Sequence, residues 1–321
     1  MPYEQKFMLV IKMNIKNILE ILKHPKSIYL NIKHRRKVTR NFWDYYFVKL
    51  GVKKSAVIRF YDSEKFLLTK QNLNQFFERE FQKKIMLDKP KGFDFKKQGG
   101  KIVFSLDHLK FITNKALEGC AILETFVEKQ YDWLDVKGKT VVDVGANIGD
   151  TAVYFSKVKH AKQVIAFEPY PYTYKMAVEN IKINKVKNVV LLNEGVGKQN
   201  DFMIIDASFE SDSGSALKNF KKGKKVKINS LESIVRKYKI ENAVLKMDCE
   251  GCEYDIILNS SSNVLRKFDQ MIIETHYGCE KIEDKLKNSG FEVRHVNNGV
   301  LLSKVENEEA LVLDFVFASK K

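Results

Sequence analysis

VVDVGANIGD, residues 141–150, is the stretch that decides the fold of this chain. Its valines predict a short buried strand, and Gly145 and Gly149 allow the backbone to turn tightly after it. The apolar run TAVYF at 151–155 predicts the start of a helix. A strand, a glycine turn and a helix in this order direct free backbone N–H groups at a ligand above the edge of a sheet.

A second apolar run, QVIAF at 163–167, ends in Glu168, which follows Gly149 by nineteen residues. An acidic side chain at the end of the second strand can accept hydrogen bonds from both hydroxyls of a ribose. We therefore expect a cofactor that contains a nucleoside.

The glycine turn separates two classes of such cofactors. Dinucleotide-binding turns need G-x-G-x-x-G so that pyrophosphate can approach the backbone, and here Asn147 replaces the second glycine. The carboxylate of Asp143 would repel a pyrophosphate but would attract an ammonium group. S-adenosylmethionine carries an ammonium group and a ribose and has no phosphate. The pattern therefore favours this methyl donor over a nicotinamide dinucleotide.

Five motifs occur in order after residue 120: VVDVGANIGDTAVYF, FEPYP, LLNEGVG, LKMDCEGCEYDIIL and IIETH. With these motifs the chain resembles the FkbM family of S-adenosylmethionine-dependent methyltransferases from about Ala121 to His295, more than half its length. The most specific feature is Asp-x-Glu-Gly-x-Glu, about 100 residues after the glycine turn. The resemblance implies methyl transfer to oxygen (EC 2.1.1.-).

Helical and strand patterns alternate from residue 121 onward, which predicts a parallel sheet with right-handed crossovers. Helices are expected at 122–134, 151–158, 172–184, 230–239 and 280–289, and strands at 140–145, 163–167, 188–193, 243–248, 270–274 and from 291. A last strand at 311–317 is expected to run antiparallel. We therefore expect a Rossmann-like α/β fold, the class I methyltransferase sheet, with a smaller basic α+β region at the N-terminus.

Ligands of such sheets bind beyond the carboxyl ends of the strands. Residues after the first, second and third strands are expected to contact the methionine, the ribose and the adenine of the cofactor, respectively: Asp143, Gly145, Ala146, Asn147 and Gly149; Glu168 and Pro169; and Asn193, Glu194 and Gly195. Two structural alternatives stay open, because Asp143 could cap the turn and Glu168 could be a surface carboxylate.

The ends of the fourth and fifth strands are expected to carry the chemistry. Strand alternation puts Lys246, Asp248 and Glu250 on one side, and Glu274 and His276 follow the same rule on the next strand. Transfer to a hydroxyl needs a base, and His276 is the first choice because it titrates near neutral pH. Asp248 is the second choice. The alternatives are a histidine that only shapes the site and a lysine that pairs with a carboxylate.

Two cysteines at 249 and 252, together with His276 and Cys279, have the ligand types of a zinc site. The cysteine pair flanks Glu-Gly, however, and no segment shows the turn of a zinc knuckle. We therefore predict no metal and small, partly buried thiols. A divalent cation held by the carboxylates remains an alternative, and 211–215 is either a lid over the site or a solvated insertion.

The net charge of +16 is unevenly distributed along the chain. Residues 1–130 carry 27 Lys/Arg and 13 Asp/Glu, a net charge of +14, and residues 131–321 carry a net charge of only +2. This asymmetry suggests two regions, a basic N-terminal region at 1–120 and a methyltransferase domain at 121–321. No apolar run approaches the roughly 20 residues that span a bilayer, and four cysteines without framework spacing indicate a reducing, cytoplasmic setting.

The basic excess includes an amphipathic helix at 13–23, the basic run 33–37 and an aromatic cluster at 42–47. Three interpretations are open: a helix docked on the core, which we prefer; peripheral contact of residues 12–47 with an anionic membrane surface; and contact with nucleic acid. A small hairpin is expected at 55–70, and mixed helix and loop at 71–130.

The sequence thus predicts an O-methyltransferase that acts on a hydroxyl of a glycan, a glycolipid or another small-molecule secondary metabolite. One alternative is an RNA methyltransferase that uses the basic arm. It is disfavoured because Asp248-Cys-Glu-Gly is not the turn that grips a flipped base. A cofactor-binding module without catalysis is the other alternative, and the sequence assigns no oligomeric state.

Overall fold

The computed structural model of the chain describes residues 35–87, 91–205, 223–275, 278–302 and 311–320. It forms two compact units, one from residues 1–91, 115–117 and 299–310 and the other from 92–114, 118–298 and 311–321. The helix predicted at 13–23, the loop 211–215 and His276 lie outside the described residues. The functional boundary after residue 120 stays a prediction.

The first unit contains α4 (Trp43–Lys49), a hairpin of β1 (Ser55–Arg59) and β2 (Lys65–Thr69), the short η1 (Lys70–Asn72) and α5 (Leu73–Leu87). The hairpin confirms the prediction for 55–70, with Ser55 opposite Thr69 and Arg59 opposite Lys65. An aromatic core that includes Tyr45 and Phe76 holds the unit together.

Arg35, from the predicted basic run, is part of this core rather than of a solvated arm. Its guanidinium carbon lies 3.6 Å from the centre of the Tyr45 ring. Two of its nitrogens donate to the two carboxylate oxygens of Glu80 at 2.7 and 2.8 Å. A planar guanidinium suits such a two-point contact and the stacking on an aromatic face. This observation supports the docked interpretation for this part of the arm.

An antiparallel sheet of β3 (Phe93–Gln98), β4 (Lys101–Leu106) and β5 (Leu109–Thr113) opens the second unit. The prediction of helix and loop for this stretch was wrong. Gly99 and Gly100, at φ +58° and +79°, form the two-residue turn of a hairpin. Buried and exposed side chains alternate in β4 and β5, but the many lysines and glycines around them hide this period in the sequence.

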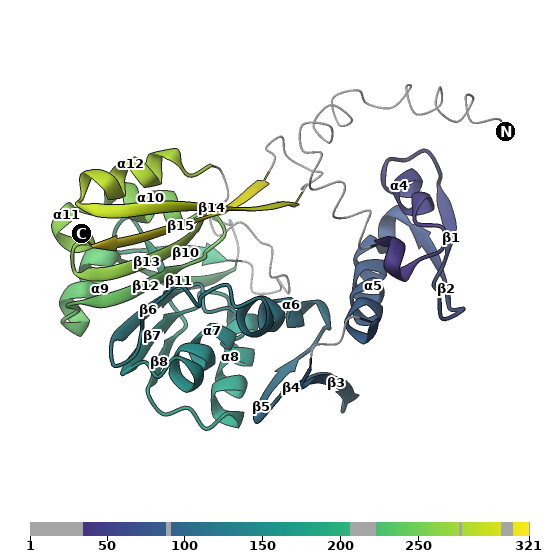
Figure 1. The fold of residues 1–321 in the computed structure, drawn as a ribbon, viewed down its shortest axis with the longest axis horizontal. Helices are drawn as coiled ribbons and strands as arrows, with labels where there is room; N and C mark the ends of the chain where they lie inside the picture. Colours follow the sequence, from purple (N-terminus) through teal and green to yellow (C-terminus); the bar gives the residue numbers. More distant parts are fainter. Residues whose placement is uncertain (1–34, 88–90, 206–222, 276–277, 303–310, 321) are drawn as a thin grey trace. The chain divides into compact units, whose positions relative to one another are not determined.

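The main sheet has seven strands in the order β14-β15-β13-β12-β6-β7-β8. Their bounds are β6 (Thr140–Val144), β7 (Gln163–Phe167), β8 (Val189–Leu192), β12 (Ala243–Met247), β13 (Phe268–Thr275), β14 (Phe291–Leu302) and β15 (Leu311–Lys320). The strands from β13 to β8 are parallel, and β15 runs antiparallel to β13. The predicted methyltransferase fold, including its reversed last strand, is confirmed (Figure 1).

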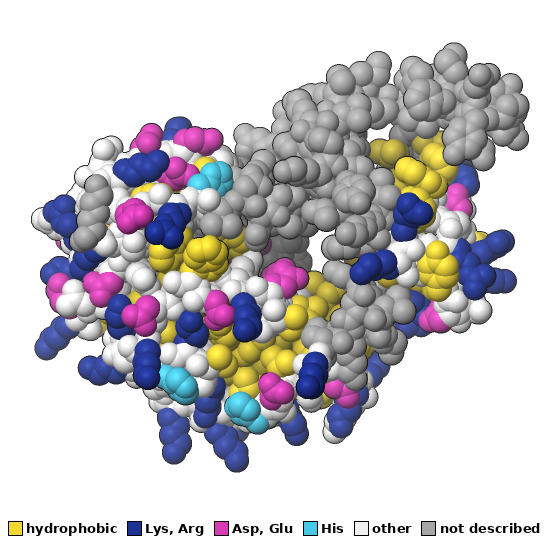
Figure 2. All heavy atoms as spheres, viewed as in Figure 1, with side chains coloured by type: hydrophobic (Ala, Val, Ile, Leu, Met, Phe, Trp, Pro, Cys, Tyr) yellow, Lys and Arg dark blue, Asp and Glu magenta, His cyan; other side chains and the backbone are white. Residues whose placement is uncertain are grey.

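A second small sheet follows β8 and consists of β9 (Gly195–Gly197), β10 (Asp201–Ile205) and β11 (Lys224–Ser230). Strand β11 pairs antiparallel with β10 and parallel with β9. The sequence analysis predicted no strand here. On the face of the second unit in Figure 2, Lys and Arg side chains project between Asp and Glu side chains, as its near-neutral charge leads one to expect.

Helices cover both faces of the main sheet. One face carries α7 (Asp150–Val153), its π-helical continuation η4 (Tyr154–Val158) and α8 (Pro171–Ile183). The other carries α9 (Leu231–Tyr238), α10 (Glu253–Asn259), α11 (Ser262–Leu265) and α12 (Glu280–Asn288). The helix predicted at 122–134 is shorter, comprising η2 (Leu117–Gly119), α6 (Cys120–Ile122) and η3 (Leu123–Val127), because the chain turns at Lys129 with φ +56°.

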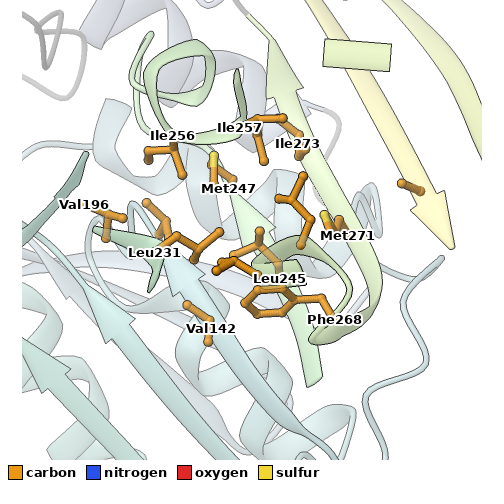
Figure 3. Close-up of a cluster of buried hydrophobic side chains, with 14 of the residues drawn as sticks. Val142, Val196, Leu231, Leu245, Met247, Ile256, Ile257, Phe268, Met271 and Ile273 are labelled. Atoms are coloured by element: carbon orange, nitrogen blue, oxygen red, sulfur yellow. The ribbon is translucent and has the colours of Figure 1, made fainter. Parts of the chain in front are cut away.

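Strand alternation creates two hydrophobic cores. Val142, Leu245 and Met247 point to the core under α9 to α12, which is drawn in Figure 3. Val141 and Val244, one residue out of phase with them, belong to the core on the α7 side. No helix in the described parts of the chain is long and apolar enough to cross a membrane.

Candidate active site

A cavity of about 310 Å³ lies at the carboxyl ends of β6, β7 and β12, beside the small sheet. Its lining includes Gly145 and Asn147 of the glycine turn, Glu168 after β7, and Asp248 and Glu250 after β12. This is the position that the sequence predicted for a ligand, beyond the carboxyl ends of parallel strands.

The glycine turn packs directly on the end of β12. Gly145 has φ +84°, and a Cβ atom at this position would lie 1.7 Å from the carbonyl oxygen of Asp248. Only glycine fits there, because any side chain would collide with the neighbouring backbone.

The amides of this turn are mostly engaged within the protein. The N–H groups of Gly145 and Ala146 both donate to the carbonyl oxygen of Phe167, and that of Gly149 donates to Ala146. The N–H of Asn147 donates to Glu168 at 2.9 Å. The prediction of free N–H groups was therefore wrong at these four positions. A turn without these donors cannot hold a pyrophosphate in the manner of a dinucleotide site.

Glu168 is only 5% exposed and joins the first two strand ends. Its Oε1 accepts from the N–H of Tyr170 and the hydroxyl of Thr173, and its Oε2 accepts from Asn147. Burial raises the pKa of Glu168 to about 7, although these three hydrogen bonds and Lys246 oppose the shift. A carboxylate offers about four acceptor positions, so Oε2 keeps capacity for a ribose hydroxyl.

Asp143 and Lys246 form a buried ion pair beneath the turn, not in the cavity lining. Lys246 Nζ lies 3.2 Å from Asp143 Oδ1 and donates to the carbonyl oxygen of Gly145 at 2.6 Å. The hydroxyl of Thr151 donates to Asp143 Oδ2 at 2.6 Å. Burial opposes the charge of Lys246, but Asp143, Asp248 and Asp150 raise its pKa. The predicted alternative of a lysine that pairs with a carboxylate is thus what the structure shows.

A second acidic pair joins the cavity to the neighbouring strand. Asp248 and Glu274 each follow the paired residues Met247 and Ile273, and their side chains hydrogen-bond to each other. Burial, the charges of Asp248 and Glu124 and this hydrogen bond raise the pKa of Glu274 well above its usual value. This raised pKa keeps Glu274 protonated to a higher pH than an ordinary glutamate, so Glu274 can donate its proton in the hydrogen bond to Asp248.

The turn after β12 is strained and closed by a disulfide. Glu250 and Gly251 have φ +59° and +108°, and a non-glycine residue at such a φ is uncommon. This turn brings the Cα atoms of Cys249 and Cys252 to 5.5 Å, and their sulfurs are bonded. The prediction of two thiols here was wrong, whereas Cys120 and Cys279 are not disulfide-bonded. Cys249, Glu250 and Cys252 all line the cavity.

Some predicted contacts lie behind the cavity rather than in its lining. Asn193 donates to the carbonyl oxygens of Glu168 and Pro169, both at 2.9 Å. Glu194 accepts from Asn229 at 2.8 Å, and Ala146 is fully buried. These residues hold the loops in place. Of the predicted adenine group, only Gly195 lines the cavity.

Other lining residues were not predicted, and all of them except Tyr170 lie outside the five motifs. They come from the turn after β7 and from the small sheet: Tyr170, Thr173, Lys198, Gln199, Phe202, Met203 and Ile228. Only the unpredicted pairing of β9, β10 and β11 brings the last five together. Apolar side chains from this group and Phe167 give the cavity the mixed lining that a nucleoside needs.

A family model described as "Methyltransferase FkbM domain" matches residues 143–293. None of the curated proteins compared with the chain matches it. The solved structures similar to it include an FkbM methyltransferase from Methylobacillus flagellatus (14% identity, 56% of this chain and 43% of that one, TM-score 0.36). They also include M. jannaschii TYW2 in complex with AdoMet (13%, 72% and 88%, TM-score 0.34).

A third similar structure is the ribosomal protein L11 methylase from Lactobacillus delbrueckii subsp. bulgaricus (17%, 64% and 78%, TM-score 0.31). TM-scores this low support no conclusion about this chain. The family assignment therefore rests on the family model, and the strand order and the cavity agree with it. Residues 143–293 of this chain thus form a methyltransferase domain of the FkbM family, whose cofactor is S-adenosylmethionine.

Proposed function

We propose that this chain transfers a methyl group to a hydroxyl of a glycan, a glycolipid or a related secondary metabolite. The observation that carries this proposal is the pair of Asp248 and Glu274, because Asp248 also lines the cavity. A hydroxyl must lose its proton when it accepts a methyl group, and the carboxylate of Asp248, hydrogen-bonded to Glu274, can accept that proton.

S-adenosylmethionine supplies the electrophilic methyl group. This chain would hold the cofactor: Glu168 would accept a hydrogen bond from the ribose, with Pro169 and Gly195 beside it, and Gly145 and Asn147 would contact the methionine part. Asp143 acts indirectly: it pairs with Lys246, which donates to the carbonyl oxygen of Gly145. Ala146, Gly149, Asn193 and Glu194 keep the turns in place. Alignment of this kind supplies much of the rate in a two-substrate reaction.

In this proposal the carboxylate of Asp248 accepts the proton of the acceptor hydroxyl while Glu274 keeps its own proton, so the pair goes from one negative charge to none. A positioned base of this kind contributes roughly 10²–10⁴ in rate. His276 is the competing candidate for the base. It follows β13 directly in sequence but lies outside the described residues. In this proposal the acceptor enters from the side of the cavity that Glu250 lines.

We propose that the protein is cytoplasmic and that its basic N-terminal region does not read bases. A helix docked on the core remains the preferred interpretation of this region, and peripheral contact of residues 12–47 with an anionic membrane surface is the second. Arg35 cannot contribute to it, because this guanidinium is held by Glu80 and Tyr45. Nucleic acid stays the alternative substrate, and no observation on the described residues favours it.

Two binding measurements test the cofactor part. Isothermal titration with S-adenosylhomocysteine is expected to give micromolar affinity, and titration with NAD is expected to give none. Glu168→Gln should weaken the first by about tenfold, because a charged hydrogen bond contributes roughly 1.5–3 kcal/mol. Glu232→Gln, an exposed glutamate on α9, is the matched control and should change nothing.

Methyl transfer from labelled cofactor to glycan, lipid-glycan and RNA fractions tests the acceptor part. We expect label in an alkali-stable ether of a glycan or lipid-glycan fraction, and Asp248→Asn should lower the rate at least 10²-fold while keeping the affinity for S-adenosylhomocysteine. Label in RNA alone would replace the acceptor proposal. Unchanged activity of Asp248→Asn would transfer the role of base to His276.

A further inference from the structure

Three side chains of different chemistry converge where α12 meets β14. Cys279 is the residue before α12, Glu283 lies one turn along this helix, and His295 is on β14. One potential ligand atom from each lies within 4.8 Å of the other two. This group is separate from the cavity, since none of its members lines it.

The distances suit a shared metal ion. Cys279 Sγ lies 3.7 Å from each ring nitrogen of His295, and Glu283 Oε1 lies 3.6 Å from Nδ1. Zinc bonds of about 2.3 Å to sulfur and about 2.0 Å to nitrogen place these two atoms roughly 3.5 Å apart at a tetrahedral angle. Small movements of these side chains would therefore be enough to complete the site.

Two of the ligands are already oriented by the fold. The N–H of Glu283 donates to the carbonyl oxygen of Cys279 in the first turn of α12, which puts both side chains on one face of the helix. Glu283 Oε2 accepts from Lys287 Nζ at 2.9 Å, so its Oε1 is directed towards the imidazole. Outer partners of this kind orient the ligands in natural metal sites.

The third ligand leaves the site accessible. The His295 side chain is 37% exposed, whereas Cys279 is only 4% exposed. An ion can thus enter from solvent and keep a water in its fourth position, while the sulfur stays protected.

We propose that Cys279, Glu283 and His295 bind one divalent metal ion, with zinc as the best match to a sulfur, nitrogen and oxygen ligand set. The sequence analysis predicted no metal, and it considered Cys279 only together with Cys249, Cys252 and His276. Cys249 and Cys252 are bonded to each other. The actual partners lie four and sixteen residues after Cys279, where no motif marks them.

Such an ion would clamp three successive elements: the turn after β13, helix α12 and strand β14. Metal bonds that link separate elements stabilise the folded state, because the unfolded chain does not hold the ligands together. The proposed role is therefore structural, and it does not depend on which acceptor the enzyme methylates.

Zinc titration of the metal-free protein, without reductant, tests the site. We expect one zinc per chain in competition with a chromophoric chelator, together with a higher Tm. Cys279→Ser, Glu283→Gln and His295→Gln should each weaken binding at least tenfold. Cys120→Ser, Glu280→Gln and His108→Gln are the matched controls for the three residue types and should bind as the parent does.

Cobalt adds a spectroscopic signature for the thiolate. A sulfur-to-metal charge-transfer band should appear in the parent and in Cys120→Ser and should be absent in Cys279→Ser. Circular dichroism of the metal-free variants checks that they fold. The proposal is wrong if the parent takes up no metal, or if folded Cys279→Ser keeps its affinity and its band, in which case the ion binds elsewhere.

Discussion

Lys246 lies 3.2 Å from Asp143 and 2.6 Å from the carbonyl oxygen of Gly145, so one buried ammonium group joins two neighbouring strands and the glycine turn. The pair is almost completely shielded from water. Its attraction is therefore weakly screened, and the loss of either partner leaves a buried charge without compensation.

Lys246→Met should consequently destabilise the protein by about 3–5 kcal/mol, because Asp143 would remain buried and charged. Urea unfolding measures this loss. The double variant Lys246→Met/Asp143→Asn should recover part of it. Lys267→Met removes a lysine that pairs with Glu241 at the surface and should cost less than about 1 kcal/mol. If Lys246→Met and Lys267→Met lost the same unfolding free energy, the expected cost of breaking the buried pair would be wrong.

Gly145→Ala should remove both stability and cofactor binding. Its Cβ would collide with the Asp248 backbone, and overpacking together with the positive φ costs roughly 2–5 kcal/mol. Gly138→Ala is a matched control, since Gly138 has φ +71° with no atom within 4 Å of its Cβ. It should lose only about 1–2 kcal/mol. Unfolding free energies and titrations with S-adenosylhomocysteine compare the two variants.

Glu168 should make stability depend on pH in a defined direction. Its pKa is raised from 4.5 to about 7 by burial, so the folded state binds its proton more tightly than the unfolded state does. The resulting stability is complete below pH 4.5 and is lost as the pH rises to about 7, by about 3 kcal/mol at most. In Glu168→Gln this decline should be absent. Unfolding curves from pH 4 to 8 provide the comparison, and parallel profiles of the two proteins would contradict the raised pKa.

Reduction of the disulfide between Cys249 and Cys252 should loosen the turn that carries Glu250. The closed loop is short, so chain entropy gives a loss of only roughly 2 kcal/mol. In denaturant, a thiol reagent should titrate two cysteines in the oxidised protein and four after reduction. Cys249→Ser/Cys252→Ser should have reduced stability that no longer responds to reductant. Four reactive thiols before reduction would show that the bond does not form.

The parallel strands of the main sheet could be predicted because their signals are local. Val141, Val142 and Val144 mark a strand, Gly145 marks a turn, and alternation with helices restricts the crossovers. Glu168 could be placed for the same reason, as the residue that ends a strand.

The parts that escaped prediction depend on contacts between distant residues. The small sheet pairs Gly195 with Ile228, and no periodic pattern in either segment predicts this pairing. Asn193 and Asp143 carry polar groups at the expected strand ends, yet these groups bind Pro169 and Lys246 rather than facing the cavity. Residue type and spacing predict the strand end, but only packing decides which way a side chain points.

Strand β15 lies between β14 and β13, although it is the last of the three in sequence. Residues 311–320 must therefore leave the ribosome before the interior of this sheet can close, and until then β13 exposes an unpaired backbone edge over Gln270–Thr275. Nascent chains of this protein should depend on chaperones longest at this step. A chain that stops before Leu311 would leave the facing backbone edges of β13 and β14 unpaired and prone to aggregation.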